Sequence, residues 1–112
     1  MGHTYTPKET QDYEKTIRTL VKAEMKEQYK EWAFVQMRFY YALPQSAPKK
    51  KKQMVEIAPL MHTKRPDVDN LQKSVMDALN GVLWEDDAIV FAVVAQKHYD
   101  TRDHIKITVE GE

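Results

Sequence analysis

Apolar residues recur at two different spacings along the chain, and each spacing predicts one kind of secondary structure. In the first third they repeat every three or four residues, the spacing of a helix with one buried face: Tyr13, Ile17, Leu20, Val21, Met25 and Tyr29. Just upstream, Thr6, Pro7 and Glu9 supply a cap, a first-turn proline and a capping-box carboxylate. We therefore expect a surface helix that begins near Thr6 and continues to Tyr29.

The spacing changes to two between residues 33 and 43, which predicts a strand with one buried face. The apolar positions on that face are Val35, Met37, Phe39, Tyr41 and Leu43. Pro44 is expected to end this strand. The residues that follow, 49–60, fit either a loop or a short helix broken by Pro59.

A second helix is predicted after Pro66, followed by two strands. The apolar face of this helix consists of Val68, Leu71, Val75, Ala78, Leu79 and Val82. Gly81 can supply its left-handed C-terminal turn. The continuous apolar run at residues 88–95 predicts a strand buried on both faces. Residues 104–109 alternate as a last strand, and the short polar connection at 99–103 predicts a hairpin between these two strands.

This order of helices and strands predicts a small α+β domain in which a mixed sheet packs with two main helices. The 112 residues form one domain, residues 1–112, with a modest core that favours association with a second copy. The absence of cysteine excludes disulfides and thiolate metal sites. No apolar run is long enough to cross a membrane and no signal peptide is visible, so we expect a soluble cytoplasmic protein.

Charge is balanced overall but unevenly distributed along the chain. The formal net charge is zero, which taken alone argues against a nucleic-acid partner. Two basic clusters nevertheless stand out: Lys49, Lys50, Lys51 and Lys52 in the first, and Lys64 and Arg65 in the second. A locally basic face on a neutral protein is sufficient to bind phosphates.

Two carboxylates, Asp67 and Asp69, stand two residues apart where the second helix begins. Residues just before a helix are not yet helical, so this spacing can bring both carboxylates to one point. Carboxylates suit Mg²⁺, and Lys73, one turn further along, can stabilise negative charge on a phosphate. A third carboxylate is expected from Asp86 or Asp87, just before the apolar strand. Metal-dependent hydrolysis of a phosphodiester needs this set of groups.

Each of these residues also has an ordinary structural role. Asp67 could cap the helix, Asp69 could favour its dipole, and Lys73 could pair with Asp69 or Asp77 on the surface. The residues alone therefore leave a metal site and a set of structural contacts both open. Trp84 is expected in the core rather than stacked on a base. The four histidines are expected at the surface because they show no metal-ligand spacing.

Two segments, residues 62–73 and 77–87, resemble the signature of RusA-type Holliday junction resolvases, and the resemblance extends over most of the chain. It implies a RusA-like fold and a homodimer. It also implies magnesium-dependent cleavage of branched DNA, a four-way junction, by paired symmetric nicks in recombination and repair. Mn²⁺ is the alternative ion.

The resemblance also implies roles for individual residues. The implied metal ligands are Asp67, Asp69 and Asp87, with Asp86 as the alternative to Asp87, and Lys73 is implied to act on the phosphate. The two basic clusters are then expected to bind the DNA backbone. A two-fold dimer would present two equivalent sites to the two equivalent phosphates of a two-fold junction.

The chain departs from the family at its start. Family members usually begin with an apolar strand and a basic loop before a segment like residues 3–7, whereas this chain begins inside that segment. We expect the first strand to be missing, which would expose a sheet edge and remove DNA-binding cations. Three alternatives to a resolvase remain: a junction-binding module without catalysis, a prophage remnant without either activity, and a metal enzyme acting on another phosphate ester.

Overall fold

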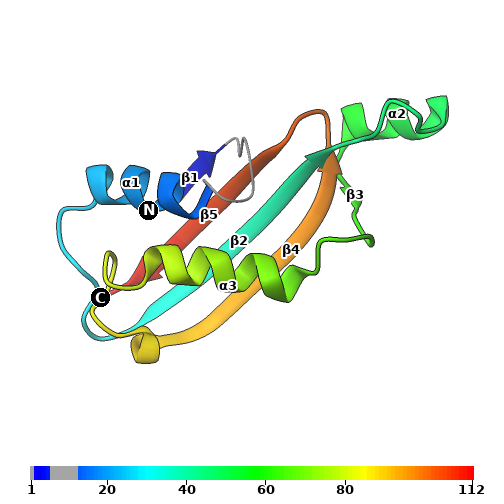
Figure 1. Cartoon of the computed structure of the whole chain (residues 1–112). Coiled ribbons are helices and arrows are strands. Elements are labelled where there is room, and N and C mark those ends of the chain that lie inside the picture. Colours follow the sequence, from blue (N-terminus) through cyan, green and yellow to red (C-terminus); the bar gives the residue numbers. More distant parts are fainter. Residues whose placement is uncertain (1, 6–12) are drawn as a thin grey trace.

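A five-stranded mixed sheet and three α-helices form the part of the chain described by the computed structural model, residues 2–5 and 13–112 (Figure 1). In chain order the elements are β1 (Gly2–Tyr5), α1 (Tyr13–Glu24), β2 (Ala33–Ala42), α2 (Lys49–Ile57), β3 (Leu60–Met61), α3 (Val68–Leu79), the 3₁₀ turn η1 (Asp87–Ile89), β4 (Val90–Asp100) and β5 (His104–Gly111). The α+β class expected from the sequence is confirmed. Within these residues no helix is long and apolar enough to cross a membrane.

The strand order across the sheet is β1-β5-β2-β4-β3, with β2 in the centre. Strand β2 runs parallel to β4 and antiparallel to β5, and the outer strands β1 and β3 are antiparallel to their neighbours. Val35 of β2 faces Val93 on one side and Val109 on the other, so a row of β-branched side chains crosses three strands. Met37 and Phe39 continue this face of β2, and all three β2 side chains are buried, as the alternation predicted.

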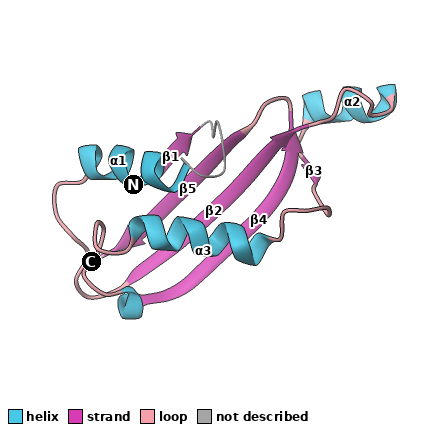
Figure 2. Ribbon diagram, viewed as in Figure 1, coloured by secondary structure: helices cyan, strands magenta, loops and turns pink. Residues whose placement is uncertain are grey.

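Helices α1 and α3 lie on the same face of the sheet, over these rows (Figure 2). The buried core draws on both helices, strands β2 and β5 and the loop after α3: Ile17, Val21, Ala33, Val35, Met37, Phe39, Leu71, Val75, Ala78, Leu79, Leu83, Trp84, Ile105, Ile107 and Val109. Partly buried residues of β4 pack against it. The Arg18 guanidinium joins the two helices by donating to the carbonyl oxygens of Asp77 (2.6 Å) and Ala78 (3.2 Å). No described helix covers the opposite face, where Arg38 and Lys106 are exposed (Figure 2).

The first helix is shorter than the apolar spacing predicted. It ends at Glu24, although Met25 still donates its backbone N–H one turn back (3.0 Å). Tyr29 instead donates its backbone N–H to the carbonyl oxygen of Leu83 (2.8 Å), in the loop after α3. The apolar side chain at Tyr29 thus packs on the core from a loop and not from a helix. The capping residues expected at 6–9 lie outside the described residues.

The apolar run at residues 88–95 does not form a strand buried on both faces. Strand β4 begins at Val90, continues to Asp100, and contains no fully buried residue. The side chains of Phe91 and Val94 are 70% and 41% exposed. The reason is that the described helices cover one face of the sheet only, so the other face of β4 stays open.

The predicted hairpin between the last two strands is also wrong, because β2 lies between β4 and β5. The short connection passes over the end of β2 and is bonded to it. Leu43 donates its backbone N–H to the Asp100 carbonyl oxygen (3.1 Å), and Ala42 donates to the Asp103 carboxylate (2.7 Å). These polar residues therefore close the end of a central strand instead of forming a tight turn.

Three smaller segments complete the comparison with the sequence. Residues 49–60, left open between loop and helix, form α2 and the first residue of β3. Strand β1, for which the pattern gave no prediction, pairs antiparallel with β5. Gly81 adopts a φ of 80° just beyond α3, as expected of a glycine in a left-handed C-terminal turn.

Trp84 fills the core below the loop that follows α3, as the sequence predicted. Its side chain is fully buried. Trp84→Ala is therefore expected to lower the free energy of unfolding by about 3–5 kcal/mol, because truncation leaves a large cavity. Urea unfolding measures this change when it is followed by far-ultraviolet circular dichroism, a backbone signal that does not depend on Trp84. Glu85→Ala, at the exposed neighbouring residue, should leave the unfolding midpoint nearly unchanged.

Candidate active site

Asp67 and Asp69 lie at the start of α3 with exposed side chains. Asp67 occupies the N-cap position in an extended conformation, and its carboxylate makes no capping hydrogen bond. The capping role that the sequence left open is therefore not realised at Asp67. Both carboxylates are available to a ligand outside the helix, at the end where the helix dipole is positive.

Lys97 of β4 fixes the segment that leads into α3. Its ammonium donates to the backbone carbonyl oxygens of Lys64 and Pro66, the latter at 2.7 Å. The Lys97 carbonyl oxygen accepts the backbone N–H of His62 at 3.2 Å. The residue just before Asp67 is thus held to the sheet. Sequence analysis missed this role, although Lys97 is the first charged residue after the apolar run of β4.

His62 is buried where β3 meets β4, contrary to the surface position expected for the histidines. Its ring lies between those of Tyr41 and Tyr99, with centroid distances of 4.8 and 4.4 Å. Burial lowers the pKa of His62 below its usual value, and the nearby positive charge of Lys97 lowers it further. Both effects favour the uncharged form of the ring, which packs beside the site. His104 is buried as well.

Lys73 and Asp77 follow Asp69 along α3, each about one helical turn further on. Both side chains are exposed, and within residues 13–112 neither Asp69 nor Asp77 forms an ion pair with Lys73. The surface pair that the sequence left open is absent there. The Lys73 ammonium is free to meet an anion brought to the start of the helix.

Asp86 and Asp87 lie at η1, beyond the other end of α3. The Asp86 carboxylate accepts the backbone N–H of Ala88 at 2.9 Å and so caps this turn. Asp87 is exposed, and its side chain makes no such bond. Of the two candidates for the third ligand, Asp87 is therefore the one whose carboxylate is uncommitted.

One chain does not bring the three aspartates together. Helix α3 has 12 residues, and at 1.5 Å per residue it separates Asp67 from η1 by about 18 Å. Strand β4 runs a similar distance from η1 to Lys97. Figure 1 shows η1 beyond one end of α3, whereas Asp67 stands at the other end. Among the described residues, no three His, Asp or Glu side chains are placed to hold one ion.

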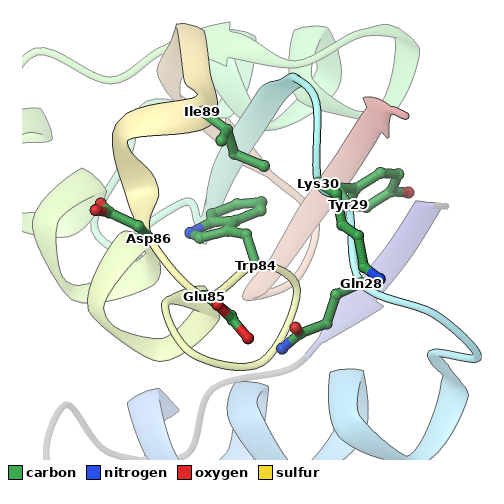
Figure 3. Close-up of a pocket in the computed structure, with 7 residues that line it drawn as sticks. All are labelled: Gln28, Tyr29, Lys30, Trp84, Glu85, Asp86 and Ile89. Atoms are coloured by element: carbon green, nitrogen blue, oxygen red, sulfur yellow. The ribbon is translucent and has the colours of Figure 1, made fainter.

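A cavity of about 420 Å³ lies beside η1 (Figure 3). Trp84 and Ile89 form its apolar wall, and Gln28, Tyr29, Lys30, Glu85 and Asp86 complete the lining. The carboxylate of Asp86 points away from the other labelled side chains in this view. Asp87 does not line the cavity, so this hollow is not a metal site by itself.

The two basic clusters meet at the end of the sheet that carries Asp67. Lys51 of α2 and Lys64 line the same cavity of about 300 Å³, together with Thr63 and Tyr99. The remaining lysines of the first cluster are exposed along the first turn of α2. The two clusters are therefore neighbours in space, and the second one directly precedes the start of α3.

These features define a candidate phosphate-ester site on an α+β domain, with paired carboxylates at a helix start beside a basic surface. A family model described as Endodeoxyribonuclease RusA matches residues 1–110. The chain therefore belongs to the RusA endodeoxyribonuclease family. It is also 35% identical to "Uncharacterized protein YqaN" of Bacillus subtilis (strain 168) over 75 residues, 65% of this chain and 53% of that protein. The match thus spans about half the length of that relative.

Proposed function

We propose that this protein is a metal-dependent endodeoxyribonuclease that resolves four-way DNA junctions by paired, symmetric nicks. The observation that carries the proposal is the exposed, uncommitted pair of carboxylates at the start of α3, in a chain that belongs to the RusA family. Mg²⁺ is the ion that suits such oxygen ligands, and Mn²⁺ is the alternative.

The donor set fits a hard divalent cation. Asp67, Asp69 and Asp87 supply carboxylate oxygens that no hydrogen bond from a helix cap occupies. A cation bound there would neutralise charge on the scissile phosphate and lower the pKa of an attacking water. Lys73 would bind a non-bridging phosphate oxygen and stabilise the charge that develops during hydrolysis. Residues 64–65 and the lysines of α2 would hold the DNA backbone.

The separation of the aspartates supports a homodimer. Since about 18 Å of helix lies between Asp67 and η1 in one chain, the third carboxylate of each site would come from a second copy. A two-fold dimer then contains two equivalent sites, each with Asp67 and Asp69 from one chain and Asp87 from the other. Two such sites can nick two symmetric strands of a junction.

A synthetic four-way junction, labelled on each strand in turn, tests the proposal. We expect nicks at symmetric positions in two opposite strands with Mg²⁺ or Mn²⁺, none with EDTA, and none in a linear duplex of the same sequence. Junction binding without cleavage in either metal would favour a binding module. Absence of both binding and cleavage at physiological salt would favour a prophage remnant.

Lys97 acts on this site through the backbone of the residues before Asp67. Lys97→Met is expected to slow nicking about 10-fold, the scale typical of groups that orient metal ligands. Lys97→Arg should restore part of the rate, because a guanidinium can still donate to the Pro66 carbonyl oxygen. Lys106→Met, on the open face of the sheet, is the matched control. Equal rates for Lys97→Met and Lys106→Met would contradict a positioning role.

A further inference from the structure

The cavity of about 300 Å³ lies where the loop after β2, helix α2 and the segment after β3 meet the end of β4. Its apolar wall includes Leu43, Pro44 and Met61, and the aromatic residue Tyr99 also lines it. Sites for small ligands usually have volumes of about 300–1,000 Å³. This cavity is therefore of a size that suits one small group, such as a single nucleotide.

The polar part of the lining carries positive charge and hydroxyl groups. Lys51 lies one helical turn before Val55, the buried residue of α2, so it is on the side of the helix that faces the sheet. Lys64, Ser46 and Thr63 complete the polar lining, and none of the described residues around the cavity has a carboxylate. Within the described chain neither ammonium forms an ion pair. An anionic ligand with an apolar or aromatic part matches these walls.

Contacts within the chain hold the walls of the cavity in place. In the loop after β2, Ala47 donates its backbone N–H to the carbonyl oxygen of Pro44 at 3.0 Å and so closes a turn. On the opposite wall, the ring of Tyr99 packs against that of His62, with 4.4 Å between the centroids. Because these walls are already ordered, a ligand would bind without a large cost for ordering side chains.

The cavity also adjoins the paired carboxylates at the start of α3. Lys64 precedes Asp67 by three residues, which span at most about 10 Å of extended chain. The backbone carbonyl oxygens of Lys64 and Pro66 both accept from the Lys97 ammonium, so the cavity and the carboxylates are fixed to the same strand of the sheet. A DNA strand with one nucleotide in the cavity would therefore carry a neighbouring phosphate to Asp67.

We propose that this cavity receives one unpaired nucleotide of a branched DNA strand, with the base against Tyr99 and the phosphates on Lys51 and Lys64. Bases of any sequence can stack on an aromatic side chain, whereas a phosphate alone would leave the apolar wall without a partner. In a linear duplex every base is already paired and stacked, and it must leave the stack to enter a pocket. The role in branched DNA rests on the proposed nuclease function, but the capture of an unpaired base does not depend on cleavage.

Binding of short single strands tests the contact with the base. Fluorescein-labelled pentathymidylate and a pentamer of abasic deoxyribose phosphates with the same charge are titrated with the full chain in EDTA, and anisotropy is measured. We expect the wild type to bind pentathymidylate about 10-fold more tightly, the scale of one stacked base. Tyr99→Leu should bind both pentamers equally, while Tyr99→Phe keeps the difference, and circular dichroism checks that each variant is folded. Equal affinity of the wild type for the two pentamers would overturn the inference.

Two neighbouring lysines supply a second test, which does not require any change at Tyr99. Lys51→Gln and Lys50→Gln each remove one charge from the exposed first turn of α2, but only Lys51 lines the cavity. We expect Lys51→Gln to weaken the binding of pentathymidylate about 5-fold and Lys50→Gln less than about 2-fold at the same salt concentration. Equal losses would mean a general attraction to the lysine run and would overturn the inference.

Gel shifts in EDTA extend the test to branched DNA. The preference of the wild type for a four-way junction over a linear duplex of the same sequence should fall in Tyr99→Leu and persist in Tyr99→Phe. A wild-type chain that nicks junctions but does not distinguish the two pentamers would overturn the inference and leave the nuclease intact. Base-dependent binding by a chain that never nicks would support the inference and contradict the nuclease.

Discussion

Asp69→Asn is expected to reduce magnesium-dependent nicking of a four-way junction at least about 100-fold. Changes to groups that merely orient metal ligands already cost 10–100-fold, and this change removes the charge of a proposed ligand itself. The amide keeps the size of the side chain, and Asp69 is exposed and bonded to no other side chain of the described chain. Stability and junction binding should therefore remain close to those of the wild type.

The matched control is Asp77→Asn, the same chemical change two turns further along the same helix, about 12 Å away. Its side chain is equally exposed, and Arg18 donates to its backbone carbonyl oxygen and not to its carboxylate. Nicking rates, gel-shift affinity at matched salt and urea unfolding are measured for both variants. Persistent cutting by Asp69→Asn, or an equal loss in both variants, would remove Asp69 from the site.

The second large effect is the recovery of nicking activity when two inactive variants are mixed. Asp69→Asn and Asp87→Asn should each be inactive alone, yet a mixture refolded together should recover about one quarter of the wild-type sites. Random pairing makes half of the dimers mixed, and each mixed dimer contains one intact site when Asp69 and Asp87 come from different chains. The other site of that dimer carries both substitutions.

A mixture of Asp67→Asn with Asp69→Asn separates this rescue from simple refolding. Both substitutions lie at the same end of α3, so every site of every dimer contains one of them and no activity should return. Recovery in this control would mean that Asp67 and Asp69 of one site come from different chains, contrary to the proposal. Failure of the first mixture when both variants dimerise normally would place Asp69 and Asp87 in the same chain's site.

The parts of the fold that local spacing determines could be predicted from the sequence. The three- and four-residue repeat of Leu71, Val75 and Ala78 reports one buried face of α3, and the alternation from Val35 to Phe39 reports one buried face of β2. The sheet order could not be predicted in this way. A connection of a few residues looks the same whether the two strands it joins are neighbours or have β2 between them.

The candidate site also contains residues whose positions local sequence predicts and residues whose positions it does not. Asp67 and Asp69 are placed together by two residues of chain, so their proximity was visible in the sequence. The position of Asp87 depends instead on the length of α3 and on the direction of β4, which no local pattern encodes. The apolar run of β4 was interpreted as burial inside one chain, although 70% of the Phe91 side chain is exposed. An apolar pattern in a strand does not distinguish burial inside one chain from contact with another chain.

The Lys97 ammonium belongs to β4, beside the short edge strand β3, and it donates to the backbone just before Asp67. One side chain thus ties a surface available for association to the spacing of two acidic groups. Any tilt of β4 as chains meet would be transmitted to the mouth of α3 through this short link. Association of two chains and the arrangement of the carboxylates would then be coupled, and a single chain would not cleave intact DNA.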